Sequence, residues 1–186
     1  PTSTPVPKPT SAPAPAGYKV GTTVKQQKTN GYYKVTSAQT VEYLRPVNKK
    51  AGTVVIPDSV NLNGANYKVT SVGTKAFKNN KYLKKLTIGN NVVQIKNYAF
   101  YKCAKLNTVK IGKAVQYIGK QSFYGCKKIS TMRIYTSRLK QKNIGSNAFK
   151  GTPSRMKVYT LRKLVKSYKS IFIKRGMSKN IVMKKL

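Results

Sequence analysis

The chain has 186 residues and is 39% hydrophobic, so it is long enough for one domain with a core and too apolar to be disordered throughout. It carries 38 Lys and Arg against two acids, Glu42 and Asp58, and no His, which gives a formal net charge of +36. This composition excludes Ser-His-Asp and Cys-His catalysis and leaves too few thiols and carboxylates for a zinc or calcium site. We therefore expect no enzyme, no cofactor and no metal, and we expect an anionic partner because charge of one sign disfavours a compact state.

Residues 1–16, PTSTPVPKPTSAPAPA, alternate Pro with small residues, which predicts an extended spacer outside any core. The sequence has no initiator Met, no signal peptide and no apolar run of about eighteen residues, so nothing in it predicts a transmembrane segment. We expect a fragment of a larger protein, joined to it through this spacer.

From residue 17 to 57 the apolar residues alternate with polar ones, which predicts a β meander with strands at 32–36, 40–44 and 53–57. Residues 17–53 would form a cap over the open end of the first repeat. Residues 61–72, with Asn-Gly-Ala-Asn as the turn, predict a hairpin-like insertion.

The centre of the chain is an internal repeat. Residues 86–108 are followed by residues 109–131 with their apolar positions in register, so that Phe100 corresponds to Phe123. A fixed period of this length predicts a solenoid over residues 54–159, in which each unit buries its apolar face against its neighbours. The segment through each Ala-Phe pair predicts a helical turn with Phe pointing inward. We expect parallel strands at 86–88, 109–111, 132–134 and 158–160, and a second short extended piece before residues 72, 95, 118 and 144.

Four motifs carry a resemblance to a known family: Ile-Pro-Asp-Ser-Val at 56–60, Ala-Phe at 99–100, Cys-x-x-Leu at 103–106 and Ile-Gly at 118–119. They resemble the BspA-like leucine-rich repeats of bacterial surface proteins. The resemblance implies a leucine-rich repeat solenoid of short parallel β-strands and short helical turns, with an N-terminal β-hairpin or meander cap and a C-terminal helix-strand cap. It also implies a cell-surface or cell-wall-associated extracellular location, with adhesion or protein recognition as the role, and it identifies no functional residues.

Residues 160–186 predict the C-terminal cap of a domain spanning 17–186. Leu161, Leu164, Val165, Tyr168 and Phe172 share one face of a helix predicted over 160–176, with Thr160 as N-cap, Gly176 as stop and a strand at 181–183. A basic amphipathic helix can instead lie on a membrane surface. We favour the cap because the helix directly follows the last repeat, whose open face needs covering.

Cys103 and Cys126 occupy equivalent positions in adjacent units, at a separation that a disulfide can bridge. Asn80 and Thr152 stand in the same register, so the column holds small residues whatever their redox chemistry. This favours two buried free thiols over a bond.

The cations are predicted to form rows, because side chains one repeat apart align when coils stack. Lysine supplies 32 of the 38 positive charges, and this bias favours diffuse attraction to a polyanion over bidentate readout by arginine. The alternative is that the lysines only solubilise the surface. The candidate polyanion-binding residues are Lys81, Lys84, Lys85, Lys102, Lys105, Lys110, Lys127, Lys128 and Arg133, and the candidate stacking residues are Tyr117, Tyr135 and Tyr159.

The leading functional hypothesis is a non-catalytic, strongly basic extracellular module that attaches a larger protein to an anionic polymer, such as teichoic acid, an acidic polysaccharide or a host glycan. A second hypothesis is protein adhesion through the concave sheet, centred on Thr87, Lys110, Arg133 and Tyr159. A third is nucleic-acid binding, which the charge permits and the scarcity of arginine disfavours.

Overall fold

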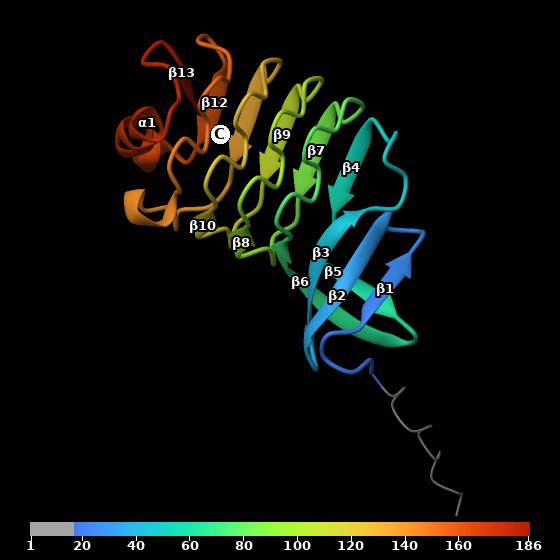
Figure 1. Ribbon diagram of the computed structural model, residues 1–186. Helices are drawn as coiled ribbons and strands as arrows, with labels where there is room; N and C mark the ends of the chain where they lie inside the picture. Colours follow the sequence, from blue (N-terminus) through green and yellow to red (C-terminus); the bar gives the residue numbers. More distant parts are fainter. Residues whose placement is uncertain (1–16) are drawn as a thin grey trace, which may run out of the picture.

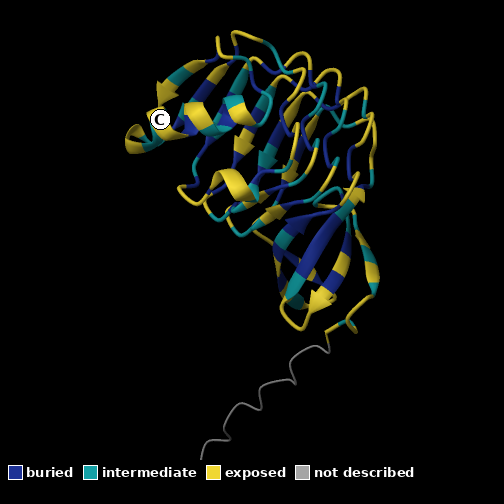
Figure 2. Ribbon diagram, turned by 60° about the vertical axis from the view of Figure 1, so that its left-hand side comes forward, coloured by how far each residue is buried: buried dark blue, intermediate teal, exposed yellow. Residues whose placement is uncertain are grey.

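The computed structural model describes residues 17–186, which form a stack of coils with a β-rich cap at one end and a helix-containing cap at the other (Figure 1). The predicted spacer, residues 1–16, lies outside the described residues. Apolar side chains from the coils and from both caps form one core cluster. Buried residues occur along the whole stack (Figure 2). The strands are β1 Thr23–Gln26, β2 Gly31–Ser37, β3 Thr40–Pro46, β4 Thr53–Ile56, β5 Ser59–Leu62, β6 Ala65–Val72, β7 Lys85–Ile88, β8 Gln94–Ile95, β9 Thr108–Ile111, β10 Tyr117–Ile118, β11 Thr131–Ile134, β12 Lys157–Thr160 and β13 Val182–Lys185, and the helices are η1 Gln141–Asn143, η2 Arg162–Leu164 and α1 Val165–Lys174.

One side of the stack is a six-stranded parallel sheet in the order β13-β12-β11-β9-β7-β4. The four predicted repeat strands are confirmed as β7, β9, β11 and β12, each one residue longer at its start. Their pairing keeps the register of the repeat, since Leu86 lies opposite Val109 and Val109 opposite Met132. The second and fourth residues of these four strands are buried, so the first and third project outward and form rows across the sheet.

The other side is a seven-stranded sheet in which β1, β2 and β3 are antiparallel, while β3, β6, β8 and β10 run parallel. The short extended pieces predicted before residues 95 and 118 are β8 and β10, and Ile144 forms a single bridge with Ile118. The predicted hairpin is confirmed as β5 and β6. Its turn residues Asn63 and Gly64 both have positive φ, at 51° and 83°, as a type I′ turn requires.

The predicted meander is wrong in one strand. β4 does not pair with β3; it pairs in parallel with β7 and begins the six-stranded sheet. The third strand of the meander is β1, which the sequence pattern did not predict. Val54 and Ile56 alternate with polar residues equally well in either sheet, so a period of two predicts a strand here without predicting its partners.

The turns that follow the second sheet are not helical turns, which corrects another prediction. Each is a succession of four-residue β-turns with two left-handed residues four positions apart, such as Tyr98 at φ 59° and Lys102 at φ 52°. A left-handed residue interrupts a right-handed helix. It also directs alternate N–H groups at the next coil, where Tyr98 donates to Lys120 O at 3.0 Å and Lys102 donates to Tyr124 O at 2.7 Å.

The inward-pointing phenylalanines are confirmed and form a ladder through the whole stack. Phe77, Phe100, Phe123 and Phe149 stack with ring centroids 5.2, 5.1 and 5.8 Å apart, and all are at most 3% exposed. Tyr43 of β3 begins the ladder 5.7 Å from Phe77, and Phe172 of α1 ends it 5.4 Å from Phe149. Both caps therefore continue the core of the repeats instead of merely covering it.

The C-terminal cap consists of η2, α1 and β13, and β13 pairs with β12 as the last strand of the parallel sheet. Tyr168 and Phe172 are the buried residues of the helix face, while Leu161, Leu164 and Val165 are only partly buried. Thr160 is not the N-cap; it is the buried last residue of β12, and α1 begins after Leu164 without a side-chain cap. Gly176, at φ 102°, ends the helix as predicted, and the Met177 N–H donates to Phe172 O in the same C-terminal motif.

Candidate binding surfaces

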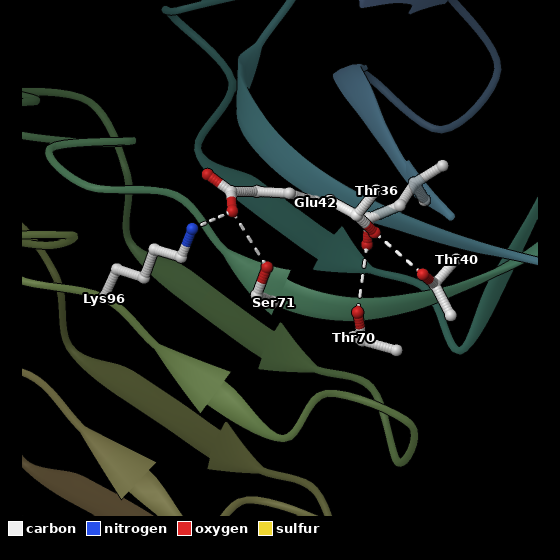
Figure 3. Close-up of polar contacts among 7 residues, drawn as sticks. Thr36, Thr40, Glu42, Thr70, Ser71 and Lys96 are labelled. Atoms are coloured by element: carbon white, nitrogen blue, oxygen red, sulfur yellow. Dashed lines mark hydrogen bonds and ion pairs between the residues drawn. The ribbon is translucent and has the colours of Figure 1, made fainter. Parts of the chain in front are cut away.

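Both acids of the chain are engaged in holding the fold. Glu42 of β3 is 8% exposed, pairs with the Lys96 ammonium and accepts a hydrogen bond from the Ser71 hydroxyl at 3.1 Å (Figure 3). This contact joins β3 of the cap to β6 and to the coil that follows β8. Since Lys96–Glu42 is the single salt bridge within residues 17–186, every other Lys and Arg of that range lacks a carboxylate partner.

Asp58 lies beside the start of the parallel sheet, where its carboxylate accepts the Asn90 N–H at 2.5 Å and the Asn90 side-chain amide at 3.3 Å. The corner it braces is tight, because a Cβ added to Gly112 would collide with the backbone carbonyl of Gly89. The two carboxylates share no hydrogen-bond partner, since Glu42 contacts Lys96 and Ser71 whereas Asp58 contacts Asn90.

The cysteines are buried and free, which confirms the expectation from their column. The Cys103 thiol donates to Phe77 O and the Cys126 thiol donates to Phe100 O, each at 3.1 Å. The neighbouring Cys126 thiol, followed by burial, raises the pKa of the Cys103 thiol far above its usual range. A thiol kept neutral in this way is a small packing group and a poor nucleophile.

Buried tyrosines mark the two caps. Burial raises the pKa of Tyr33 to about 12 although its hydroxyl donates to the Thr29 hydroxyl at 2.9 Å. Burial likewise raises the pKa of Tyr43 and of Tyr168. The Tyr168 hydroxyl donates to Thr136 O at 3.0 Å and accepts the Leu139 N–H at 3.2 Å, which fixes the loop after β11 to the C-terminal helix.

The outer face of the parallel sheet carries the row that the sequence predicted. Thr87 lies opposite Lys110, Lys110 opposite Arg133, and Arg133 opposite Tyr159. The Arg133 guanidinium sits over the Tyr159 ring, 4.6 Å from its centroid. A pocket of about 360 Å³ adjoins this row, with Val55, Thr87, Lys110 and Tyr135 in its lining. We call this surface the sheet face.

Most of the candidate cations lie elsewhere, on the edge of the stack where the turns lead into the parallel sheet. Lys127, Lys128, Arg155 and Lys157 line a pocket of about 630 Å³ on this edge. Because the strand register places Thr108 opposite Thr131, Lys105 and Lys128 occupy equivalent positions in adjacent coils. We call the exposed lysines of this edge the cationic edge: Lys81, Lys84, Lys85, Lys105, Lys127 and Lys128.

The remaining candidate, Lys102, lies on the turns, where its ammonium is 5.4 Å from the centroid of the Tyr101 ring. Tyr101 in turn stacks on Tyr124 of the next coil at 5.2 Å. The candidate cations thus divide among the cationic edge, the sheet face and the turns, and do not form one patch.

The candidate stacking residues differ in exposure. Tyr117 of β10 is 44% exposed, as expected, whereas Tyr135 and Tyr159 are half-buried, and Tyr159 already stacks with Arg133. No sequence pattern favours Tyr82 over the other tyrosines, yet Tyr82 is 45% exposed. It lines a groove of about 470 Å³ between the N-terminal cap and the first coil. The groove forms where β3 stops pairing with β6, after Tyr43, and no local sequence pattern predicts that point.

Within residues 17–186 no three His, Cys, Asp or Glu side chains gather as metal ligands would. No helix in the same range is both long and apolar enough to cross a bilayer.

Stacked coils with one parallel strand each, an inward aromatic ladder and an outward polar sheet define a leucine-rich repeat solenoid. Comparison with known families agrees: residues 58–178 match the model described as BspA type Leucine rich repeat region, in six copies. The chain belongs to this family. The match begins after β4 and includes the predicted C-terminal cap as far as Ser178, so α1 occupies a position within the repeat array.

Two solved structures illustrate the similarity. A leucine-rich repeat protein from Bacteroides capillosus ATCC 29799 is 24% identical, with a TM-score of 0.62 over 74% of this chain and 97% of that chain. A leucine-rich repeat protein from Bacteroides ovatus ATCC 8483 is 28% identical, with a TM-score of 0.58 over 70% of this chain and 36% of that chain. No curated protein matches the sequence significantly.

Proposed function

We propose that this leucine-rich repeat domain is a non-catalytic binding module that attaches a larger surface protein to an anionic polymer. The observation that carries the proposal is the cationic edge, where Lys105 and Lys128 are equivalent residues in adjacent coils, Lys81 and Lys127 are equivalent residues two coils apart, and none of them has a carboxylate partner within residues 17–186. Strands in neighbouring coils are about 4.8 Å apart, so cations in such a row raise one another's field. An anion bound along the row relieves that repulsion.

The expected mode of binding is release of counterions. A linear polyanion lying across the coils would meet Lys81, Lys105, Lys127 and Lys128 together, and each contact would free a condensed cation from the polymer. Lysines are mobile point charges, so they follow a flexible chain of phosphates, carboxylates or sulfates without requiring one geometry. Tyr117, on the second sheet, would add a stacking contact for a sugar ring.

The location and the attachment belong to the same proposal. We expect an extracellular, cell-surface or wall-associated module tethered through residues 1–16 to the rest of its protein. Teichoic acid, an acidic polysaccharide and a sulfated or sialylated glycan share the chemistry that the lysines would recognise.

The test compares two variants that lose the same charge. One has Lys→Gln at positions 81, 105, 127 and 128; the control has Lys→Gln at positions 19, 25, 34 and 68, which are residues of the N-terminal cap. Binding to wall polymer, to a heparin-like glycan and to DNA is measured at several salt concentrations. We expect the edge variant to reduce the slope of log K against log salt by roughly 0.7–0.9 for each lysine that no longer pairs with the polymer, and the control to change it little.

Equal losses of affinity in the two variants, or binding that does not depend on salt, would contradict the proposal. A clear preference for DNA would move the module to the nucleic-acid class instead.

One observation favours a second candidate function, recognition of a protein through the sheet face. Thr87, Lys110, Arg133 and Tyr159 form a continuous row beside a pocket, and an aromatic ring with a guanidinium above it is a common centre of protein interfaces. Ala substitutions of these four residues should then abolish binding of a protein partner that the edge variant still binds.

A further inference from the structure

The hydrogen-bond ladder of the turns has an open end at the first coil. In the second coil, Asn97, Ala99 and Tyr101 each use their backbone carbonyl to accept an N–H from the first coil, at 3.0, 2.6 and 2.8 Å. In the third coil, the carbonyls of Lys120, Ser122 and Tyr124 do the same for the second. Alternate carbonyls of each coil therefore point back toward the coil before it.

By the 23-residue repeat, the equivalent carbonyls of the first coil are those of Thr74, Ala76 and Lys78. The first coil has the same backbone conformation as the second, with left-handed residues at Lys75 and Asn79 in place of Tyr98 and Lys102. Yet no donor within residues 17–186 hydrogen-bonds to any of these three carbonyls. The first coil thus presents a row of unpaired backbone carbonyls. In the next two coils the equivalent carbonyls accept hydrogen bonds from the coil before.

The acceptors are free because β3 leaves the stack at this point. The Gly73 N–H still donates to Tyr43 O at 2.8 Å, so β3 takes the place of a preceding coil up to Tyr43. The pairing of β3 with β6 ends at Tyr43, beyond which Arg45 and Pro46 pair only with β2, and Pro46 has no N–H to offer.

The space left between the two segments is the groove of about 470 Å³. Leu44, Ala76 and Phe77 contribute apolar surface to it, and the open carbonyls belong to residues that line it. Five cations also line the groove, together with neutral polar residues and the exposed ring of Tyr82; the cations are Arg45, Lys49, Lys75, Lys78 and Lys81.

We propose that this groove binds an acidic peptide segment, whose backbone N–H groups pair with the carbonyls of Thr74, Ala76 and Lys78 and whose carboxylates meet Lys49, Lys75 and Lys78. The carbonyls of Thr74, Ala76 and Lys78 lack N–H donors. An extended polypeptide can supply them, because the N–H groups of alternate residues point to the same side. Carboxylate side chains complement the rim. The chain's own residues 1–16 do not fit, because they contain no acid and are rich in Pro.

The binding test uses a fluorescent (Ala-Asp)₄ peptide and fluorescence anisotropy at about 0.15 M salt. The groove variant has Lys→Gln at positions 49, 75 and 78, and the control variant has Lys→Gln at positions 120, 142 and 150, which are exposed residues of later coils. We expect the groove variant to weaken binding at least about tenfold and the control by less than about threefold. Similar losses of affinity in both variants would show diffuse attraction and overturn the proposal.

The hydrogen bonds are tested separately with peptides that are N-methylated on every Ala or on every Asp. At least one methylated peptide should bind the unsubstituted protein about tenfold or more weakly, and this penalty should vanish in the groove variant. Equal binding of all three peptides would overturn the proposal.

Two further outcomes separate this site from the proposed function. If anionic polymer binds unchanged to the groove variant while peptide binding is abolished, the groove is a second site. If an N-acetylated acidic glycan displaces the peptide from the groove at a lower concentration than the peptide itself, the occupant is a glycan and the peptide assignment is wrong.

Discussion

At the scale of single residues, equivalent positions in successive coils hold similar buried side chains, and one position differs. Ser122 stands in a column with Ala76, Ala99 and Ala148, and its hydroxyl is buried without a hydrogen-bond partner within the described residues. Leaving a buried hydroxyl unpaired costs free energy, because it loses water and gains nothing in return.

We therefore predict that Ser122→Ala stabilises the protein, by about 0.5–2 kcal/mol in the free energy of unfolding. Urea denaturation measures the change, and Ser137→Ala on the exposed loop after β11 is the control, expected to stay within about 0.5 kcal/mol. A destabilised Ser122→Ala variant would mean that this hydroxyl has a partner.

The cysteine column makes a second prediction at this scale. Because the neighbouring Cys126 thiol and burial raise the pKa of the Cys103 thiol, very little thiolate exists at pH 8, and both cysteines are 0% exposed. A thiol reagent should leave the native protein unlabelled for hours and label two thiols after denaturation without a reductant. Finding no reactive thiol in the denatured, unreduced protein would show a disulfide.

At the scale of elements, the turns and caps are stabilised because each pairs with polar groups that its neighbour would otherwise leave without hydrogen bonds. The C-terminal cap is the clearest case, since Tyr168 of α1 satisfies both Thr136 O and the Leu139 N–H of a loop on another coil. Arg175 adds a hydrogen bond from its guanidinium to Gln141 O at 2.7 Å. The cap thereby holds the loop after β11, which makes the interval from Ile118 to Ile144 three residues longer than the 23-residue repeat.

We predict that Tyr168→Phe destabilises the protein by about 1–3 kcal/mol, because the buried Leu139 N–H is left without an acceptor. Hydrogen exchange should show that residues 136–143 lose protection first, while β7 and β9 keep theirs. Uniformly faster exchange along the stack would instead mean that the cap and the coils open together.

At the scale of the whole molecule, the charge distribution opposes the fold that the core stabilises. The formal charge of +36 remains after both carboxylates are counted, one in an ion pair and one in hydrogen bonds, so the cations repel one another across the surface. Screening shortens its range from about 30 Å at 0.01 M salt to about 3 Å at 1 M.

We accordingly predict that the melting temperature rises with NaCl between about 0.01 and 0.5 M, and rises further at fixed low salt when a polyanion is added. Differential scanning calorimetry measures both effects. The control is a variant with Lys→Glu at positions 81, 105 and 128, whose salt dependence should be shallower. A melting temperature that falls with salt would contradict the explanation by repulsion.

The amino-acid sequence by itself determined the repeat, its strands and its inward ladder, because these depend on spacing: Phe77, Phe100 and Phe123 recur at intervals of 23 residues, and only stacked coils bury them all. It also determined the large positive charge, and it favoured free thiols over a disulfide at Cys103 and Cys126. These properties depend only on residue type and on spacing along the chain, so they can be predicted without knowing which distant segments pair.

Only the tertiary structure decided how the ends are built and where the surfaces lie. The assignment of β4 to the parallel sheet, the departure of β3 after Tyr43 and the division of the candidate cations among three surfaces all depend on pairings between segments distant in sequence. Alternating polar and apolar residues specify that a strand has a buried face, but several partners satisfy that requirement, and the packing of the whole chain selects one.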